Sequence, residues 1–384
     1  MSPSVVPPWL SGHDELWRTC AERITPDAVV DLLRRVADTP APSGASSLTR
    51  GPAVLAWCRQ DGLLDLGARL RLDAFRSGCD LLSSGRGGLR VLAHLDEVSY
   101  LLEGRSDVPG RWWVTPYCYH LAEAAAPARV VRFGGDGSWS VVATGEVVAD
   151  GDRYVFVTDP GVELAPADRV ALASDVDRAG TGRLTGSLDN AAGVVAALLA
   201  AAVLSRLGVP FSVALTDEEE GPSGAASQTI SRGAARLLRQ LDSAPLTVAV
   251  DIHGAPDHDA DEVAGHHRPW GASLAEFSSH GRGSVAPPQL YAGVTELFAG
   301  LDGPARPEGQ EVRVRANLGG YVPRSDDVVA MLHDNRVVVL GYPGVNRHFD
   351  RGLPAVHVED LVHLARALVV LAVAVDRGHL AVDW

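Results

Sequence analysis

The feature that most constrains this chain is the acidic run Asp217-Glu218-Glu219-Glu220, which directly follows a short apolar stretch. That stretch, Pro210 to Leu215, has the length and composition of a buried strand. Four adjacent carboxylates repel one another unless positive charge lies among them. In open α/β sheets, ligands bind just outside the carboxyl ends of the strands, which is where this run begins. Taken alone, the run is more simply a solvated acidic turn, so its interpretation depends on what other segments bring to the same edge.

Two further predicted strands end in polar residues of the same kind. His94 follows the apolar strand Leu89 to Ala93, and Asp96 stands two residues on, where a carboxylate can orient a metal-bound imidazole. Asp251 follows the apolar strand Leu246 to Val250. A histidine in such a place is often structural, but the nearby carboxylate favours a ligand.

Asp189 and His348 complete the set. Asp189 precedes an Ala-, Val- and Leu-rich segment, residues 190–207, that predicts a buried helix. An Asp at a helix start is ordinarily an N-cap, and one held rigidly there can also bridge two metal ions, so both roles stay open. His348 comes shortly after the predicted buried strand Val337 to Leu340.

Two imidazoles and several carboxylates around a bridging Asp suit a pair of Zn²⁺-type ions. Two such ions lie roughly 3.5–4 Å apart, lower the pKa of a shared water to about 7 and hold a substrate carbonyl against it. A separate general base must then move the proton, and the adjacent Glu218 and Glu219 supply one metal ligand and one base. The chain contains neither HExxH nor GxSxG, so zincin and serine-hydrolase interpretations have no support.

The pattern of predicted elements indicates an α/β fold with an inserted domain. From residue 187 onward, buried strands alternate with helices, which predicts a mostly parallel central sheet with helices on both faces. From residue 104 to about 177, short β-type runs alternate with Gly, Asp and Pro turns, which predicts a small β-barrel-like domain. We therefore divide the chain into an α/β domain, residues 1–103 and 179–384, and a β-rich domain, residues 104–178. Residues 1–24, rich in Pro and Ser, are predicted to be a loose lead-in.

Composition excludes several classes of partner. The formal net charge of −14 over 384 residues argues against nucleic acid, and the absence of a basic run argues against a membrane surface. The first residues lack the basic and apolar regions of a signal peptide. Four scattered cysteines without CxxC spacing fit free thiols in a reducing compartment, so we expect a cytoplasmic protein.

In combination, seven segments resemble the M42 aminopeptidases, a family of the metallopeptidase clan that also contains M20 and M28. The segments are LLRRVADTPAPSG, VLAHLDEVSYLL, GRLTGSLDNAAG, LTDEEEGPSGA, VAVDIHGAPD, YVPRSDD and GYPGVNRHFD. The order His, Asp, Glu-Glu, Asp, His is shared by the clan. The 94 residues between His94 and Asp189 are similar to the M42 spacing, because M20 and M28 members keep this gap short.

The resemblance implies a site and an activity. It implies two divalent ions, with Zn²⁺ first and Co²⁺ or Mn²⁺ as alternatives. The implied ligands are Asp189 as the bridge, His94 and Asp251 on one ion, and Glu219 and His348 on the other. Glu218 would be the general base and Asp96 the residue that orients His94. The implied reaction is removal of N-terminal residues from short peptides by a metalloaminopeptidase.

The resemblance also implies a homo-oligomer built from dimers through the inserted domain. That domain carries the aromatic residues Trp112, Trp113, Tyr117 and Tyr119. Clustered aromatics are enriched in interfaces, and they equally suit the local core of a small β domain.

Three departures from the family pattern leave the substrate open. Ser99 stands where Gly is usual, Ala191 stands where Arg is common, and the loop from Asp257 to Arg268 is enlarged and rich in Asp and His. That loop is more simply solvated than metal-binding. The same site would also serve an amidohydrolase acting on a modified amino acid or a biosynthetic intermediate. A non-catalytic binding or scaffold homologue is the third alternative, and metal content with a peptide profile would separate the three.

Overall fold

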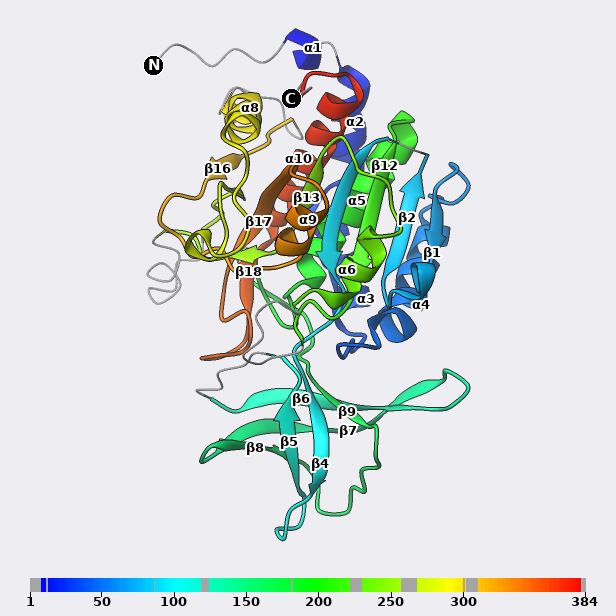
Figure 1. Ribbon diagram of the computed structural model, residues 1–384, viewed down its shortest axis with the longest axis vertical. Coiled ribbons are helices and arrows are strands. Elements are labelled where there is room, and N and C mark those ends of the chain that lie inside the picture. The colour runs from blue at the N-terminus through cyan, green and yellow to red at the C-terminus, as the bar shows by residue number, and fades with distance from the viewer. Residues whose placement is uncertain are drawn as a thin grey trace.

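The computed structural model describes residues 8–11, 13–85, 87–118, 124–180, 182–221, 230–256, 268–299, 301 and 310–380. Within these residues an α/β domain stands above a separate β-barrel, which lies at the bottom of Figure 1. The barrel is inserted between strands β3 and β10 of the α/β domain, so the chain leaves the large sheet once and returns to it.

A twelve-stranded sheet forms the centre of the α/β domain in the described part of the chain. Its order is β1-β2-β12-β3-β13-β17-β18-β11-β10. In addition, β14 and β15 pair with β17, and β16 pairs with β15. The strands are β1 (Arg69–Arg71), β2 (Asp80–Ser84), β3 (Leu89–His94), β10 (Asp177–Ala179), β11 (Arg183–Thr185), β12 (Phe211–Thr216), β13 (Thr247–Ala249), β14 (Ile252–His253), β15 (Ala272–Ala275), β16 (Val314–Ala316), β17 (Val337–Val345) and β18 (Ala355–His357).

The middle of this sheet is parallel, and its flanks are largely antiparallel. Strands β12, β3, β13 and β17 pair in parallel, whereas β1, β2, β10, β11 and β18 pair antiparallel to their neighbours. Helices cover both faces (Figure 1). The predicted α/β fold, a mostly parallel central sheet with helices on both faces, is confirmed.

Alternate residues of the central strands face different helical layers, because side chains along a strand point to opposite faces. In β12, Phe211, Val213 and Leu215 belong to the large hydrophobic core, and Ala214 belongs to a second core on the other face. The large core also takes side chains from α1 (Pro8–Ser11), α2 (Asp14–Arg23), α3 (Pro26–Ala37), α4 (Ser46–Gln60), α5 (Ala191–Leu207), α8 (Pro288–Ala299) and α10 (Val358–Asp376). The second core is closed by α6 (Arg232–Leu238) and α9 (Asp327–His333).

Helix α5 is the buried centre of the helical layer. Every residue from Ala191 to Ser205 is buried, because α5 packs at once against α10, α3 and α2 and against β3 and β12. Its many alanines keep the helix narrow enough to fit between these neighbours, and Gly208 ends it with a φ of 67°. Among the described residues, no helix is long and apolar enough to cross a membrane.

The inserted domain is a closed six-stranded barrel with the order β4-β5-β8-β7-β6-β9. Its strands are β4 (Ser99–Arg105), β5 (Arg111–Pro116), β6 (Ala126–Phe133), β7 (Trp139–Asp150), β8 (Arg153–Val157) and β9 (Arg169–Leu172). Tyr100, Trp112 and Phe156 lie in a core of its own. The predicted β-barrel-like insertion is therefore confirmed, although β4 begins before the predicted boundary at residue 104.

Three of the four clustered aromatic residues, Trp112, Trp113 and Tyr117, have contacts within the barrel, and Tyr117 packs against the edge of its core. Trp112 is part of its core, and the Trp113 ring lies 4.0 Å from the guanidinium carbon of Arg153. Tyr119 lies outside the described residues. For Trp112 the structure therefore favours a local core over an interface.

The predicted loose lead-in is wrong for residues 14–23, which form α2. Leu16, Trp17 and Cys20 are buried in the large core beside α5. The Trp17 indole N–H also donates to the carbonyl of Leu10 at 3.2 Å. The sequence signals of this segment are polar and weak, so its helix is stabilised by packing rather than by propensity.

A buried ion pair holds the segment that follows His94. The Arg50 guanidinium is fully buried, donates to the Glu97 carboxylate, and also donates to the carbonyls of Leu95 at 2.5 Å and Val36 at 2.7 Å. This pair ties α4 to the strand end that carries His94.

Replacing Arg50 by Met should lower the free energy of unfolding by about 3–5 kcal/mol, because the Glu97 carboxylate would stay buried without its partner. Urea unfolding followed by circular dichroism measures the change. Arg105→Met is the matched control, since its ion pair with Glu163 is exposed and should be worth at most about 1 kcal/mol. Equal losses in the two variants would contradict the structural role of Arg50.

Candidate metal centre

The carboxyl ends of neighbouring parallel strands bring most of the predicted site residues to one buried edge of the sheet. His94 is the last residue of β3, and it lies opposite Thr216, the last residue of β12. The acidic run follows β12, and Asp251 follows β13. Because these strands are parallel neighbours, their ends must meet at the same edge.

Asp189 lies between two imidazoles. Its Oδ1 is 3.2 Å from Nε2 of His94, and its Oδ2 is 3.5 Å from Nε2 of His348. His94 Nε2 is also 3.7 Å from Oδ1 of Asp251, and His348 Nε2 is 3.2 Å from Oε2 of Glu220. The structure thus forms three groups of potential ligands. Two of them, His94 with Asp251 and His348 with Glu220, share Asp189, and the third joins His94 to Glu219 and Glu220.

Glu219 stands beside the first imidazole rather than the second. Its Oε2 is 3.8 Å from Nε2 of His94, and the carboxylate that approaches His348 belongs to Glu220. From the sequence and its family resemblance, Glu219 was expected next to His348, and Glu220 had no expected role. The last two residues of the acidic run, not the middle two, face the cluster.

Glu218 points away from the cluster into a set of hydrogen-bond donors. Its Oε1 accepts from the Tyr117 hydroxyl at 2.7 Å and from the Arg232 guanidinium at 2.6 Å, and its other oxygen accepts from Arg236. Burial opposes ionisation of Glu218, but the hydrogen bonds of Tyr117 and Arg236 outweigh it and lower the pKa of this carboxyl. The backbone of Glu218 has a φ of 57°, the left-handed conformation that turns its side chain away from its neighbours'.

Asp96 contacts both the imidazole of His94 and the backbone of the acidic run. Its backbone carbonyl lies 3.0 Å from Nδ1 of His94, while its carboxylate oxygen is 3.7 Å from the same nitrogen. The carboxylate itself accepts from the Ser43 hydroxyl at 2.5 Å and from the backbone N–H groups of Glu219 and Glu220, each at 3.2 Å. Asp96 thereby holds the acidic run as well as the imidazole.

The carboxylate of Asp189 is not used as a helix cap. The residue at the start of α5 is Asn190, whose side chain donates to the carbonyl of Val250 at 2.6 Å and accepts from the Tyr342 hydroxyl at 3.0 Å. Because the cap residue is Asn190, both oxygens of Asp189 are left to face the imidazoles. The peptide bond between Asp189 and Asn190 is cis.

Several buried carboxylates lie close together in the cluster, so their negative charges repel one another. Burial, followed by the negative charges of Asp251 and Glu220, raises the pKa of Asp189 to about 6. Burial also raises the pKa of Glu220 to about 7. Both His94 Nε2 and Asp189 Oδ1 are buried and make no hydrogen bond within the described structure, although they lie 3.2 Å apart. Positive charge placed among these atoms would relieve both the repulsion and the missing contacts.

Two residues near the cluster were given no role from sequence. Asp326 accepts from the Thr216 hydroxyl, and its Oδ1 is buried with no hydrogen-bond partner among the described residues. Arg347, directly before His348, is half-buried. The segments YVPRSDD and GYPGVNRHFD contained both, but neither composition nor spacing distinguishes them from ordinary charged residues.

The three departures from the family pattern lie in different places. Ser99, the first residue of β4, is fully buried and accepts from the backbone N–H of Ser43 at 3.3 Å, so it contacts the residue whose hydroxyl donates to Asp96. Ala191 is the buried first residue of α5. Of the loop from Asp257 to Arg268, including His258, His266 and His267, all but Arg268 lies outside the described residues.

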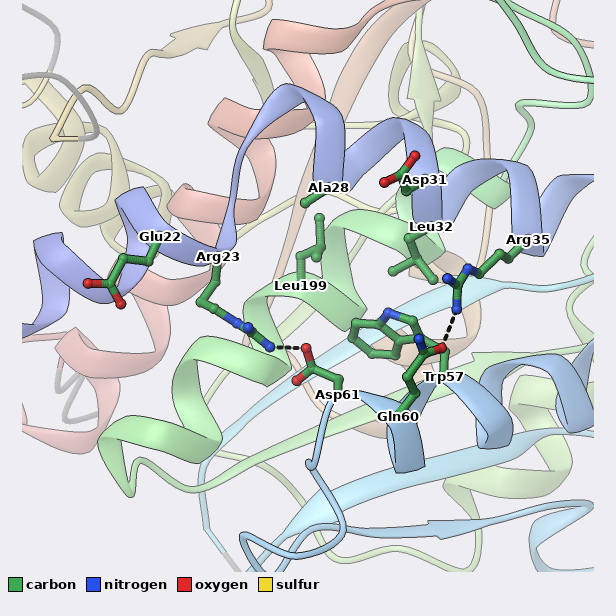
Figure 2. A pocket seen from close by; sticks show the side chains of 10 residues that line it. All are labelled: Glu22, Arg23, Ala28, Asp31, Leu32, Arg35, Trp57, Gln60, Asp61 and Leu199. Atoms are coloured by element: carbon green, nitrogen blue, oxygen red, sulfur yellow. Dashed lines mark hydrogen bonds and ion pairs between the residues drawn. The ribbon is translucent and has the colours of Figure 1, made fainter.

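A cavity of about 330 Å³ elsewhere in the α/β domain does not resemble a metal site (Figure 2). It is lined by residues of α2, α3 and α4 and by Leu199 of α5. Four of its polar groups are paired with each other, since Arg23 forms an ion pair with Asp61 and Arg35 donates to Gln60. No group of metal ligands converges there among the described residues.

No family model and no curated protein sequence matches this chain. Several solved protein structures, however, are similar to this chain. An aminopeptidase from the archaeon Desulfurococcus kamchatkensis superposes with a TM-score of 0.67 at 17% identity, over 90% of this chain and 95% of the other. The Pyrococcus horikoshii TET1 peptidase gives a TM-score of 0.63 at 17% identity, over 90% of this chain and 99% of the other. An M18-family aminopeptidase from Thermotoga maritima gives 0.56 at 13% identity, over 95% and 98%.

These matches run through both the sheet and the inserted barrel, because they cover about nine-tenths of the chain. Over about nine-tenths of its length, this chain therefore has the fold of the TET aminopeptidases.

Proposed function

We propose that this chain is a hydrolase that holds two divalent metal ions and removes N-terminal residues from short peptides. The observation that carries the proposal is the pair of ligand groups that share Asp189. The similar solved structures are named as aminopeptidases, which supports the choice of a peptide over other amides.

The spacing of the donor atoms fits two ions. Donors bound tetrahedrally to Zn²⁺ at about 2.0–2.1 Å lie about 3.3 Å from each other. The corresponding distances are 3.2 Å and 3.5 Å from the imidazoles to Asp189, and 3.2 Å and 3.7 Å from the imidazoles to Glu220 and Asp251. We assign His94 and Asp251 to one ion, His348 and Glu220 to the other, and Asp189 to both. Imidazole and carboxylate donors suit Zn²⁺ and leave Co²⁺ or Mn²⁺ open.

When bound, such a pair of ions activates a shared water and polarises the scissile carbonyl. The chain's own residues supply the proton transfer. We assign this task to Glu219, whose Oε2 lies at the cluster and which has no place in either three-residue group around Asp189. Its carboxylate would take a proton from the attacking water at Oε2 and pass it to the leaving amine.

We assign Glu218 a positioning role. Its carboxylate joins Tyr117, which directly follows β5 of the barrel, to Arg232 and Arg236 of α6. Asp96 holds the backbone of Glu219 and Glu220 from the other side. The acidic run is thus held by hydrogen bonds at Glu218 and at the backbone of Glu219 and Glu220. In this position its last two carboxylates point towards the imidazoles.

Metal content and a substrate profile on the same preparation test the proposal. We expect about two ions per chain, and hydrolysis of dipeptides and aminoacyl-anilides that stops after dialysis against a chelator and returns when the metal is restored. Bound metal with inertness towards all peptides would favour an amidohydrolase acting on another amide. A chain that binds no metal would be the non-catalytic homologue.

We also propose that the chain forms homo-oligomers built from dimers, with residues 104–178 as the association unit. One similar structure is described as a dodecamer, and the TET1 peptidase as assembling into a tetrahedron or an octahedral shell. The barrel exposes Val108 and Val141, apolar side chains that an interface would cover. Light scattering at micromolar concentration should give at least a dimer, and Val141→Asp should shift the population to lower mass. A strict monomer would contradict the proposal.

A further inference from the structure

The cavity of about 330 Å³ among the helices of the α/β domain is separate from the metal centre (Figure 2). It is lined by α2, α3, the end of α4 and α5, and none of the residues of the metal centre lines it. Pockets for small molecules occupy about 300–1,000 Å³, so this cavity lies at the small end of that range. Its size suits an amino acid rather than a nucleotide.

The inner wall of the cavity is apolar. Leu32, Trp57 and Leu199 are buried side chains of the large hydrophobic core, and the part of each that lines the cavity is a part of that core that no side chain covers. Ala28 of α3 lies beside them and is partly exposed. Its short side chain leaves the space open. The wall therefore offers a ring face and branched aliphatic groups to an apolar group of similar size.

Both ends of this wall carry positive charge. At one end, the Asp61 carboxylate is shared by two guanidiniums, because it is paired with Arg23 and its other oxygen lies 3.0 Å from Nη1 of Arg206. One carboxylate cannot neutralise two guanidiniums. At the other end, the Arg35 guanidinium donates to the neutral amide of Gln60. In Figure 2 the Trp57 ring lies between the Arg23–Asp61 pair and the Arg35–Gln60 pair.

Two further carboxylates, Glu22 and Asp31, line the cavity and are exposed to solvent. Asp31 and Arg35 are four residues apart on α3, so they are neighbours on one face of the helix. A group of each sign therefore lies next to the apolar wall. An α-amino acid has the matching chemistry, because its carboxylate, its ammonium group and its side chain are attached to a single carbon.

We propose that this cavity binds a free amino acid with an apolar side chain. The carboxylate of the ligand contacts Arg35, its ammonium group contacts Asp31, and its side chain packs on Trp57. A guanidinium is suited to a planar carboxylate, which it can meet through two parallel hydrogen bonds. The proposal is independent of the proposed function, because no residue of the metal centre takes part.

Calorimetry with L-leucine and L-phenylalanine on the metal-loaded protein measures the binding. Thermal unfolding gives a second readout, because a ligand that binds only the folded state raises Tm. Two analogues test the two charges separately: leucinamide lacks the carboxylate, and N-acetyl-leucine lacks the ammonium group. We expect each analogue to bind about tenfold more weakly than leucine, at the low end for a hydrogen bond to a charged group because both contacts are at the exposed rim.

Three variants locate the site. Ala28→Leu places a larger side chain in the cavity, so it should abolish binding without changing the circular dichroism spectrum or the metal content. Arg35→Gln should weaken the binding of leucine about tenfold and leave that of leucinamide unchanged. Arg34→Gln is the matched control, because Arg34 is exposed on the same helix and does not line the cavity. It should bind every ligand as the wild type does.

Binding of leucine at the metal centre is the competing explanation, since free amino acids are products of the proposed reaction. Such binding would survive both Ala28→Leu and Arg35→Gln and would disappear after dialysis against a chelator. That result would overturn the proposal, as would the absence of binding at millimolar leucine. Leucinamide binding as tightly as leucine would also overturn it, because the cavity would then recognise only the apolar group. Binding that persists without metal and fails in Ala28→Leu supports the proposal even if the chain hydrolyses no peptide.

Discussion

Replacing Glu219 by Gln should lower kcat by roughly 10²–10⁴-fold, the usual contribution of a positioned acid–base group. The amide has the shape of the carboxylate but cannot take a proton from water. Both metal ions should stay bound, because the two groups around Asp189 do not require Glu219. Substrate affinity should change far less, since proton transfer matters chiefly in the transition state. Steady-state kinetics and metal analysis on the same protein measure these effects.

Glu218→Gln is the decisive control for that experiment. The resemblance to the M42 aminopeptidases implied Glu218 as the base, and in that case the same large loss would fall on this variant. The geometry instead gives Glu218 two arginines and Tyr117 as partners, so its substitution should mainly loosen the acidic run and reduce kcat much less. A larger loss in Glu218→Gln than in Glu219→Gln would reverse our assignment of the two residues.

Removing the shared carboxylate should have the largest effect on metal content. Asp189→Ala should release both ions and abolish activity, because each oxygen of Asp189 faces a different imidazole. Glu220→Ala should release only the ion of the His348 group and lose activity with it. Native mass spectrometry counts the ions per chain in each variant.

A matched substitution in the same acidic run keeps this test specific. Glu218→Ala changes a neighbouring carboxylate and should retain both ions, since Glu218 lies outside the cluster. Thermal unfolding with and without chelator adds a second readout, because an ion that binds only the folded state stabilises it. If Asp189→Ala kept both ions, the bridging role would be excluded. If Glu218→Ala lost one, the ligand next to His348 would need to be reassigned.

Much of the fold followed from local patterns in the sequence. Apolar runs such as Leu89 to Ala93 and Pro210 to Leu215 predicted buried strands, and both lie side by side in the parallel centre of the sheet. The β-type runs after residue 104 predicted the barrel. Helix α2 was not predicted, because its apolar residues Leu16, Trp17 and Cys20 are scattered in a mostly polar segment. They become buried only where α2 packs against α5.

The candidate site, like the fold, could be predicted only in part from the sequence. The order of the elements determined that His94, the acidic run and Asp251 meet at one edge, since the carboxyl ends of parallel neighbours must do so. Asp189 and His348 were also predicted, and the structure brings both to the same place.

Only the tertiary structure decided which of three adjacent glutamates face that place. Their side chains are chemically identical, so spacing could not rank them. The left-handed backbone of Glu218, the arginines of α6 and Tyr117 beside the barrel turn the first glutamate away and present the next two. Those partners lie up to about a hundred residues from Glu218 in sequence and come close only in the folded chain. Local sequence determined most of the elements, α2 excepted, whereas contacts between distant elements determined the direction of these side chains.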